Sequence, residues 1–299
     1  MTALLDSAAL DQAGDTGTTL VRLIRAEFMK IRTTDAGWLF VAGFIVFTAL
    51  ALTANGFSTH FQLYPQQGQG DRAHALAAAA QARTPAGVAA IAASMMTSGQ
   101  RVGVIFALLL GVLIVTSEFA NQTAAVTFVT VPRRVTVIRA KVAAAACCGA
   151  LFWLVGTVLA AVATPLFLYS QHVSTSLAGW TMARSVLLNL LAFVAWGVFG
   201  LGLGAVLRSQ MASVVAALVV YAGSFGTMVV FNALYNLFHQ GWMLGAPVIG
   251  PAVASEVMIT SGPAFPYAPP GWVGGVILIG YTVALVAGGV VLTRRRDVI

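Results

Sequence analysis

The chain has 299 residues, of which 59% are hydrophobic and only 8% charged, and 16 basic against 9 acidic residues give a net charge of +7. Soluble domains carry about 25% charged residues, so this composition excludes an ordinary water-soluble enzyme. General disorder is excluded as well, because disordered chains combine low hydrophobicity with high charge. The mean hydropathy of +0.89 therefore indicates an all-α polytopic membrane protein.

The first 34 residues divide into a segment 1–17, which we expect to be flexible, and an amphipathic helix over 18–34. The first part lacks the apolar core of a signal peptide. In the second part, apolar and cationic residues occupy opposite helix faces: Leu20, Ile24, Phe28 and Ile31 against Arg22, Arg25 and Arg32. This pattern suits a helix that lies along the inner membrane surface. Glu27 is expected to pair with Lys30 one turn later or, alternatively, to reach a partner.

Six apolar segments have about the length that a membrane-spanning helix needs. They lie at about residues 38–54, 99–117, 142–168, 185–207, 211–231 and 272–293. Of the 16 basic residues, 12 lie before the first span, between spans 2 and 3, between spans 4 and 5, or after the last. By the positive-inside rule, both termini are predicted to be cytoplasmic. Residues 35–299 are thus predicted to form one six-span domain.

Two of the segments on the opposite side are long. Residues 55–99 include an alanine-rich stretch, Asp71–Arg83, that predicts a helix, followed by a break at Thr84-Pro85. Residues 232–271 contain six of the ten prolines together with apolar residues. Irregular backbone at membrane depth must pack against protein or line a cavity. We therefore expect short re-entrant helices before span 6, with a loose external loop as the alternative.

Several kinds of chemistry have no sequence signal in this chain. The cores of the spans contain no ionisable residue, which disfavours ion-coupled transport. Neither lysine, Lys30 or Lys141, follows the glycines of a P-loop, so the chain does not hydrolyse ATP by that route. No carboxylate pair suggests acid–base catalysis, and the four histidines fall in external segments. No catalytic or metal site is predicted, and without a basic soluble domain no nucleic acid is expected.

The segment between spans 2 and 3 contains the most informative polar residues. Glu118 stands where span 2 ends, a short polar helix is expected to about Val129, and Pro132 can begin the next element. Four cations follow: Arg133, Arg134, Arg139 and Lys141. Cations at a helix N-terminus oppose its dipole, so membrane topology or a docking surface must explain them.

This arrangement resembles the signature loop of type-2 ABC transporter permeases. In that family an acidic residue ends span 2, a coupling helix follows, and P-x-R leads to a lysine at span 3. Glu27 and Lys30 are similar to the family's E-x-x-K before span 1, and the six spans and proline-rich last external segment agree. The chain departs from the family in having Gln122-Thr123 where Gly-Thr is common, and in its long first external loop.

The resemblance implies the permease subunit of an ABC exporter in the bacterial cytoplasmic membrane. A second permease, identical or different, would complete the path, and a separate ATPase subunit would bind ATP and Mg, while this chain binds no cofactor. Residues 118–130 would form the coupling helix and 18–34 the connecting helix. The residues implied in coupling and docking are Glu27, Lys30, Glu118, Gln122, Thr123, Phe128, Pro132, Arg133, Arg134 and Lys141. The cargo would be a drug, an antibiotic or a lipid-like molecule.

In related exporters spans 2 and 5 line the path. The candidates for the lining are therefore Phe106, Leu110, Tyr221, Phe225 and Met228, with Asn189 as a polar candidate in span 4. An asparagine inside a span more commonly forms a helix–helix hydrogen bond. The glycine pairs Gly200/Gly204 and Gly271/Gly275 are expected to be packing surfaces.

Three other classes remain as alternatives to an ATP-driven permease. A secondary transporter or channel would depend on an ion gradient and need no ATPase. An intramembrane enzyme would need clustered ionisable residues at one interface. An anchor or immunity protein would transport nothing.

Overall fold

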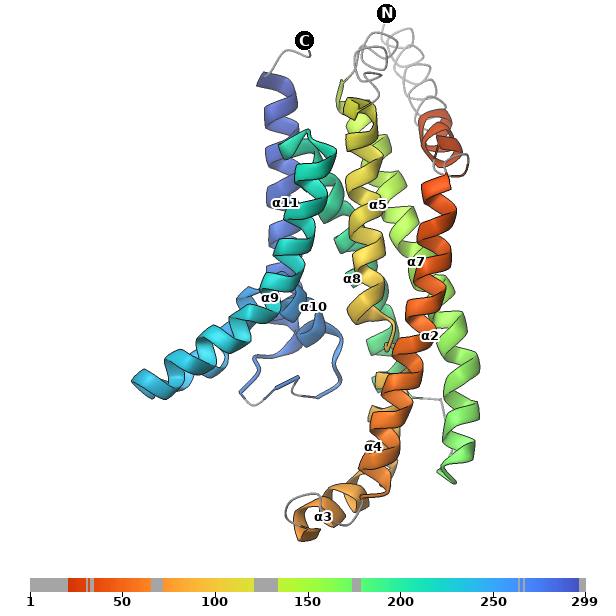
Figure 1. The fold of residues 1–299 in the computed structure, drawn as a ribbon, viewed down its shortest axis with the longest axis vertical. Helices are drawn as coiled ribbons and strands as arrows, with labels where there is room; N and C mark the ends of the chain where they lie inside the picture. Colours follow the sequence, from red (N-terminus) through yellow and green to blue (C-terminus); the bar gives the residue numbers. More distant parts are fainter. Residues whose placement is uncertain are drawn as a thin grey trace, which may run out of the picture.

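The computed structural model describes residues 21–30, 32, 35–65, 72–120, 134–173, 179–262, 264, 265 and 267–295. Within these ranges the regular elements are helices, and six of them are long and apolar enough to cross a membrane. The long helices are α2 (Asp35–Leu63), α5 (Gln100–Ala120), α7 (Arg134–Ser170), α8 (Trp180–Leu207), α9 (Gln210–Phe238) and α11 (Gly271–Arg295). The predicted all-α, six-span fold class is confirmed (Figure 1).

The shorter elements are α3 (Arg72–Ala82), α4 (Pro85–Met96), η1 (Gly241–Leu244), η2 (Ala246–Ile249) and α10 (Pro251–Ile259). The segment 21–30 is also helical. It lies at the same end of the bundle as the last turns of α11, and we call this the termini end (Figure 1). The opposite half of the molecule, which contains α10 near the middle and α4 and α3 toward the tip, is called the loop end (Figure 1).

Helix α8 lies at the centre of the bundle and contacts α5, α7 and α11. Glycines permit the closest approach: a Cβ added to Gly200 would lie 2.0 Å from Leu108 O, and one added to Gly111 would lie 2.0 Å from Gly197 O. Small residues let helix backbones approach closely inside a membrane. The predicted packing role of Gly200 and Gly204 is thus confirmed, with α5 as the partner.

An aromatic cluster fills the contact between α2, α5, α7 and α8. Phe44 is fully buried, and its ring centroid lies 4.9 Å from that of Phe152 and 6.0 Å from those of Phe106 and Phe193. The pairs of Phe44 with Phe106 and Phe193 are edge-on, and such pairs add about 0.5–1.5 kcal/mol each to the burial of their area. The cluster therefore helps to hold these four helices together.

The alanine-rich stretch between the first two predicted spans forms α3, and the predicted break at Thr84-Pro85 separates it from α4. Thr84 is the N-cap of α4, since its Oγ1 accepts a hydrogen bond from the Gly87 N–H at 3.1 Å. Proline follows at the first helical position, where its missing N–H costs nothing. Cap and proline together explain why the chain restarts a helix here.

The proline-rich segment before α11 contains the expected short helices, η1, η2 and α10. Helix α10 packs against α8, α9 and α11, and a Cβ added to Gly274 would lie 2.2 Å from Ala254 O. Gly271 and Gly275 face the same helix, so their predicted packing role is confirmed. Packing against protein meets the condition for irregular backbone at membrane depth, and the re-entrant position itself stays a prediction.

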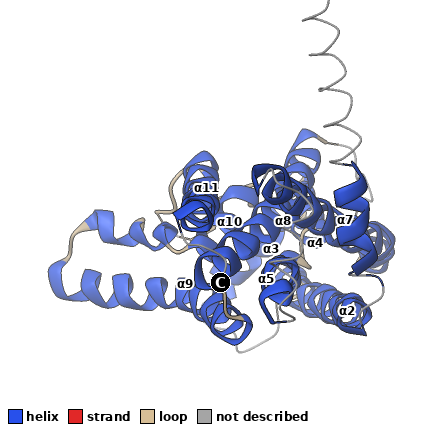
Figure 2. Ribbon diagram, turned by 90° about the horizontal axis from the view of Figure 1, so that it is seen from above, coloured by secondary structure: helices blue, strands red, loops and turns tan. Residues whose placement is uncertain are grey.

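Helix α9 leans away from the other helices toward the loop end, as the two views show (Figures 1 and 2). Its last turns expose Leu237 and Phe238. The predicted coupling helix falls largely on residues 121–133, which lie outside the described residues, as do parts of the predicted 18–34 helix and residues 1–17.

Candidate coupling site at the termini end

Four charged side chains from three separate segments meet at the termini end. Glu27 and Lys30 come from the helical segment 21–30, Glu118 from the end of α5, and Lys141 from α7. Lys30 Nζ lies 3.1 Å from Glu27 Oε1 and 2.8 Å from Glu118 Oε1. Lys141 Nζ lies 3.1 Å and 2.8 Å from the same two oxygens. Each carboxylate thus contacts both ammonium groups, and we call these residues the charge cluster.

Three of the four residues of the charge cluster are buried. Glu27, Glu118 and Lys141 expose 7%, 6% and 5% of their surface, whereas the Lys30 side chain is 51% exposed. Lys141 Nζ also donates a hydrogen bond to Ile114 O at 3.2 Å. Buried ions are tolerated when they are paired and hydrogen-bonded. Removing one partner of a buried pair costs about 3–5 kcal/mol, because the other charge is left uncompensated.

The two glutamates also keep Lys30 protonated. Partial burial lowers the pKa of Lys30, but hydrogen bonds and charge attraction from Glu118 and Glu27 outweigh burial and raise the pKa above its usual 10.5. The ammonium group is therefore present throughout the physiological pH range. The formal charges of the cluster then sum to zero, two positive and two negative.

Local sequence explains how each member reaches the cluster. Lys30 follows Glu27 by three residues and shares its helix face. Glu118 lies in the last turn of α5, and Lys141 lies two turns into α7, so the pair stands at the two ends of the segment that joins these helices. The cluster therefore ties the helical segment 21–30 to both helices that flank residues 121–133.

The structure brings together four of the predicted coupling residues. The others are Gln122, Thr123, Phe128, Pro132 and Arg133, which lie outside the described residues, and Arg134, which begins α7 and whose side chain is not among the described ones. Their docking role stays a prediction. For Glu27, the expected pairing with Lys30 is formed, and the same carboxylate also contacts Lys141 of α7. Its contact with a partner subunit stays a prediction.

The predicted path residues occupy separate parts of the bundle. Phe106 belongs to the aromatic cluster, and Leu110 lines an apolar cavity of about 220 Å³ beside α2 and α7. The Tyr221 ring lies 5.5 Å from Trp196 and 5.6 Å from Phe225. Their role in a path stays a prediction.

The two remaining path candidates are also packed within the chain. Met228 packs against the apolar cluster around α10. Asn189 is buried, and its Oδ1 has no hydrogen-bond partner within the part of the chain that the structure describes. The helix–helix hydrogen bond expected for this asparagine is thus not formed by that oxygen.

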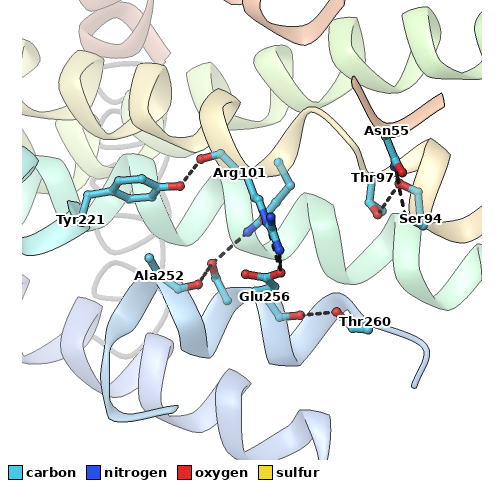
Figure 3. A network of polar contacts seen from close by, with 10 residues as sticks. Asn55, Ser94, Thr97, Arg101, Tyr221, Ala252, Glu256 and Thr260 are labelled. Carbon is cyan, nitrogen blue, oxygen red and sulfur yellow. Dashed lines mark hydrogen bonds and ion pairs between the residues drawn. The ribbon is translucent and has the colours of Figure 1, made fainter. Parts of the chain in front are cut away.

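A second polar network lies at the loop end and was not expected from the sequence (Figure 3). Arg101 at the start of α5 forms an ion pair with Glu256 of α10. The Tyr221 hydroxyl donates to Arg101 O, and Gln100 Nε2 donates to Ser255 Oγ at 2.8 Å. The one available signal was that Glu256 is the sole acid between Glu118 and Asp297. A single acidic residue in an apolar segment indicates an ion-pair partner, but the sequence does not show which residue that partner is.

No group of three or more metal-binding side chains occurs among the described residues. The adjacent cysteines Cys147 and Cys148 are both free, and Cys148 is buried. His60 Nδ1 lies 2.7 Å from Gln171 Oε1, a contact between the ends of α2 and α7.

Six apolar helices with charged groups confined to their ends define a multi-pass membrane protein. A family model described as "ABC-2 family transporter protein" matches residues 21–298. The chain therefore belongs to the ABC-2 transporter family. It is a membrane transport subunit of that family and not itself the ATPase. A search of curated proteins found no match.

Proposed function

We propose that the chain is the permease subunit of an ATP-driven exporter in the bacterial cytoplasmic membrane. A separate ATPase subunit would bind ATP and Mg, and a second permease subunit would complete the path. The cargo would be hydrophobic or amphipathic, such as a drug, an antibiotic or a lipid-like molecule. The observation that supports this proposal most directly is the charge cluster, because it connects both ends of the segment 121–133 to the N-terminal helix.

The charge cluster suits a mechanical connection. An ATPase that displaces residues 121–133 would pull on α5 and α7 together, because Glu118 and Lys141 are paired at 2.8 Å. Both helices pack on α8, which contacts α11 in turn. Packed interfaces switch between discrete arrangements instead of deforming continuously. Movement at the termini end would thus reach the rest of the bundle.

The nature of the cargo follows from the composition of the spans. Their interiors contain apolar and aromatic side chains, and the described ionisable residues of the long helices gather near their ends. A charged solute crossing such a bundle would lose its hydration without compensation. An apolar or amphipathic molecule would not.

The test is reconstitution of the chain with the ATPase subunit that copurifies with it. We expect the full-length permease to stimulate ATP hydrolysis and to move an amphipathic dye into inverted proteoliposomes. The variant Glu118→Gln should reduce stimulation at least about tenfold, the equivalent of about 1.4 kcal/mol in coupling. Arg72→Gln, which removes an exposed charge at the loop end, should leave stimulation unchanged.

Gel filtration shows whether each variant is folded before activity is compared. Undiminished stimulation by folded Glu118→Gln would contradict a coupling role for the cluster. Transport that continues without the ATPase and stops when the ion gradient is dissipated would instead establish the alternative, a secondary transporter.

A further inference from the structure

A cavity of about 650 Å³ lies at the loop end, between α2, α4, α5, α8 and α10. Its volume falls in the range of small-molecule sites, about 300–1,000 Å³. Small and polar side chains line it, and its polar groups include Asn55, Ser94, Ser98, Arg101, Ser185 and Glu256. Figure 3 shows several of them, with Arg101 and Glu256 from facing helices. The cavity therefore has both the room and the polar groups of a binding site.

In the ion pair that lines this cavity, Arg101 and Glu256 each keep hydrogen-bonding capacity that the other does not use. Arg101 donates from both Nε and Nη2 to the same carboxylate oxygen, Glu256 Oε1. Among the described residues, Glu256 Oε2 has no hydrogen-bond partner, although the side chain is only 16% exposed. The Arg101 side chain is 69% exposed. A cation donor and an anion acceptor thus stand side by side with unused hydrogen-bonding capacity.

A buried hydroxyl gives an independent indication of a ligand. Ser185 is 1% exposed and lines the cavity, yet its Oγ has no partner within the described part of the chain. An unsatisfied buried polar group is destabilising, and each one calls for an explanation such as a bound molecule. A ligand in the cavity would supply the missing hydrogen bond.

The neighbouring wall is held in place by hydrogen bonds. Asn55 Nδ2 donates to Ser94 O and Ser94 Oγ, both at 3.1 Å, and to Ser98 Oγ at 2.6 Å. This amide links α2 to the end of α4 and to the turn that follows it. A fixed wall lowers the entropy that a ligand must overcome on binding.

We propose that this cavity binds a zwitterionic group, an oxyanion and a primary ammonium a few bonds apart, as in phosphoethanolamine. The oxyanion would accept hydrogen bonds from Arg101, whose guanidinium suits phosphate or carboxylate. The ammonium would donate to Glu256 Oε2, and the Ser185 hydroxyl would complete the site. A purely anionic ligand would compete with Glu256 for Arg101 and leave a carboxylate unpaired. A quaternary ammonium has no N–H to donate.

The same chemistry has two sources, an aminophospholipid headgroup from the surrounding leaflet or a free soluble zwitterion. The site lies at the opposite end of the bundle from the charge cluster and needs no nucleotide. The inference is therefore independent of the proposed function and is tested on the isolated permease.

The experiment measures binding to the purified full-length chain in detergent micelles by native mass spectrometry and by thermal shift. The probes are phosphatidylethanolamine, phosphatidylglycerol and phosphatidylcholine of equal acyl length, and soluble O-phosphoethanolamine. We expect phosphatidylethanolamine to bind about tenfold more tightly than the other two lipids, since only its headgroup combines the oxyanion with an N–H donor for Glu256. Binding of O-phosphoethanolamine as well would identify the free group as sufficient, and its failure beside lipid binding would identify the lipid as the source.

Variants separate this site from general lipid contact. Glu256→Gln should abolish the preference for ethanolamine over choline, and Ala90→Leu, which narrows the cavity, should weaken binding. Ser185→Ala leaves the ion pair intact and should weaken binding several-fold, so the proposal stays testable if Glu256→Gln does not fold. Arg184→Gln, at the same end but outside the cavity lining, should bind as the parent does. Equal binding of all three lipids, no binding of either ethanolamine-containing probe, an unchanged preference in folded Glu256→Gln, or unchanged binding by Ala90→Leu would overturn the proposal.

Discussion

Lys141 Nζ lies 2.8 Å from Glu118 Oε1, and each of the two side chains is only 7% exposed. The two residues lie on either side of residues 121–133, the segment to which sequence resemblance assigns contact with an ATPase. Their pairing holds together the two helices between which that segment lies in the chain. A loop whose two ends are held together passes displacement to both flanking helices at once, which a loop with independent ends does not.

Removing the Lys141 charge should destabilise the protein strongly. Lys141→Gln leaves Glu27 and Glu118 buried with Lys30 as their shared partner, and losing one partner of a buried ion pair costs about 3–5 kcal/mol. We expect the midpoint of thermal unfolding to fall by several degrees. The measurement is intrinsic fluorescence of the protein in detergent during heating. Arg139→Gln, an exposed position in the same part of α7, is the matched control. Equal midpoints for the two variants would show that the cluster contributes no stability.

Exchanging the charges of Glu118 and Lys141 should restore part of the stability and ATPase stimulation that a single substitution loses. Glu118→Lys alone brings three cations around one carboxylate, whereas Glu118→Lys with Lys141→Glu returns two of each sign. Interacting neighbours show coupling energies of about 0.5–3 kcal/mol in double-mutant cycles. Thermal unfolding and ATPase stimulation of both single variants and the double variant measure this coupling. Additive losses would mean that packing, and not charge pairing, unites the site.

The contribution of Lys30 should persist to unusually high pH. Because its folded pKa lies above 10.5, the stabilisation is fully present below the unfolded pKa of about 10.4 and is lost as pH rises through the folded pKa. The difference in unfolding midpoint between the parent and Lys30→Gln should therefore be constant from pH 6 to about 10 and shrink above that range. A difference that already disappears near pH 8 would contradict this prediction.

Substitution of the central glycines should distinguish close packing from helix propensity. A Cβ in Gly200→Ala would meet Leu108 O at 2.0 Å, while one in Gly223→Ala meets nothing within 4 Å. Overpacking costs about 1–3 kcal/mol or more, whereas glycine to alanine in an open helix gains up to about 1 kcal/mol. We expect lower yield and a lower unfolding midpoint for Gly200→Ala, and an equal or higher midpoint for Gly223→Ala. The reverse order would mean that α5 and α8 are not in close contact.

Much of the architecture was predictable because it depends on local properties of the chain. The spans follow from apolar length, and the α3–α4 break follows from Thr84-Pro85. Residues three apart on a helix are neighbours, so the contact between Glu27 and Lys30 was also expected. The helices extend beyond the predicted spans: α2 reaches Leu63 and α7 begins at Arg134.

The contacts between distant segments depended on the folded arrangement. Arg101 and Glu256 are 155 residues apart, and neither periodicity nor spacing pairs them. Glu118 and Lys141 were recognised as important, yet their mutual burial becomes visible only when α5 and α7 stand side by side. Apolar spans are specified by composition, since transfer into lipid is favourable for apolar residues whatever their neighbours are. Polar partners are specified by three-dimensional packing, because a buried charge is tolerated only where an opposite charge has been brought within a few ångströms of it.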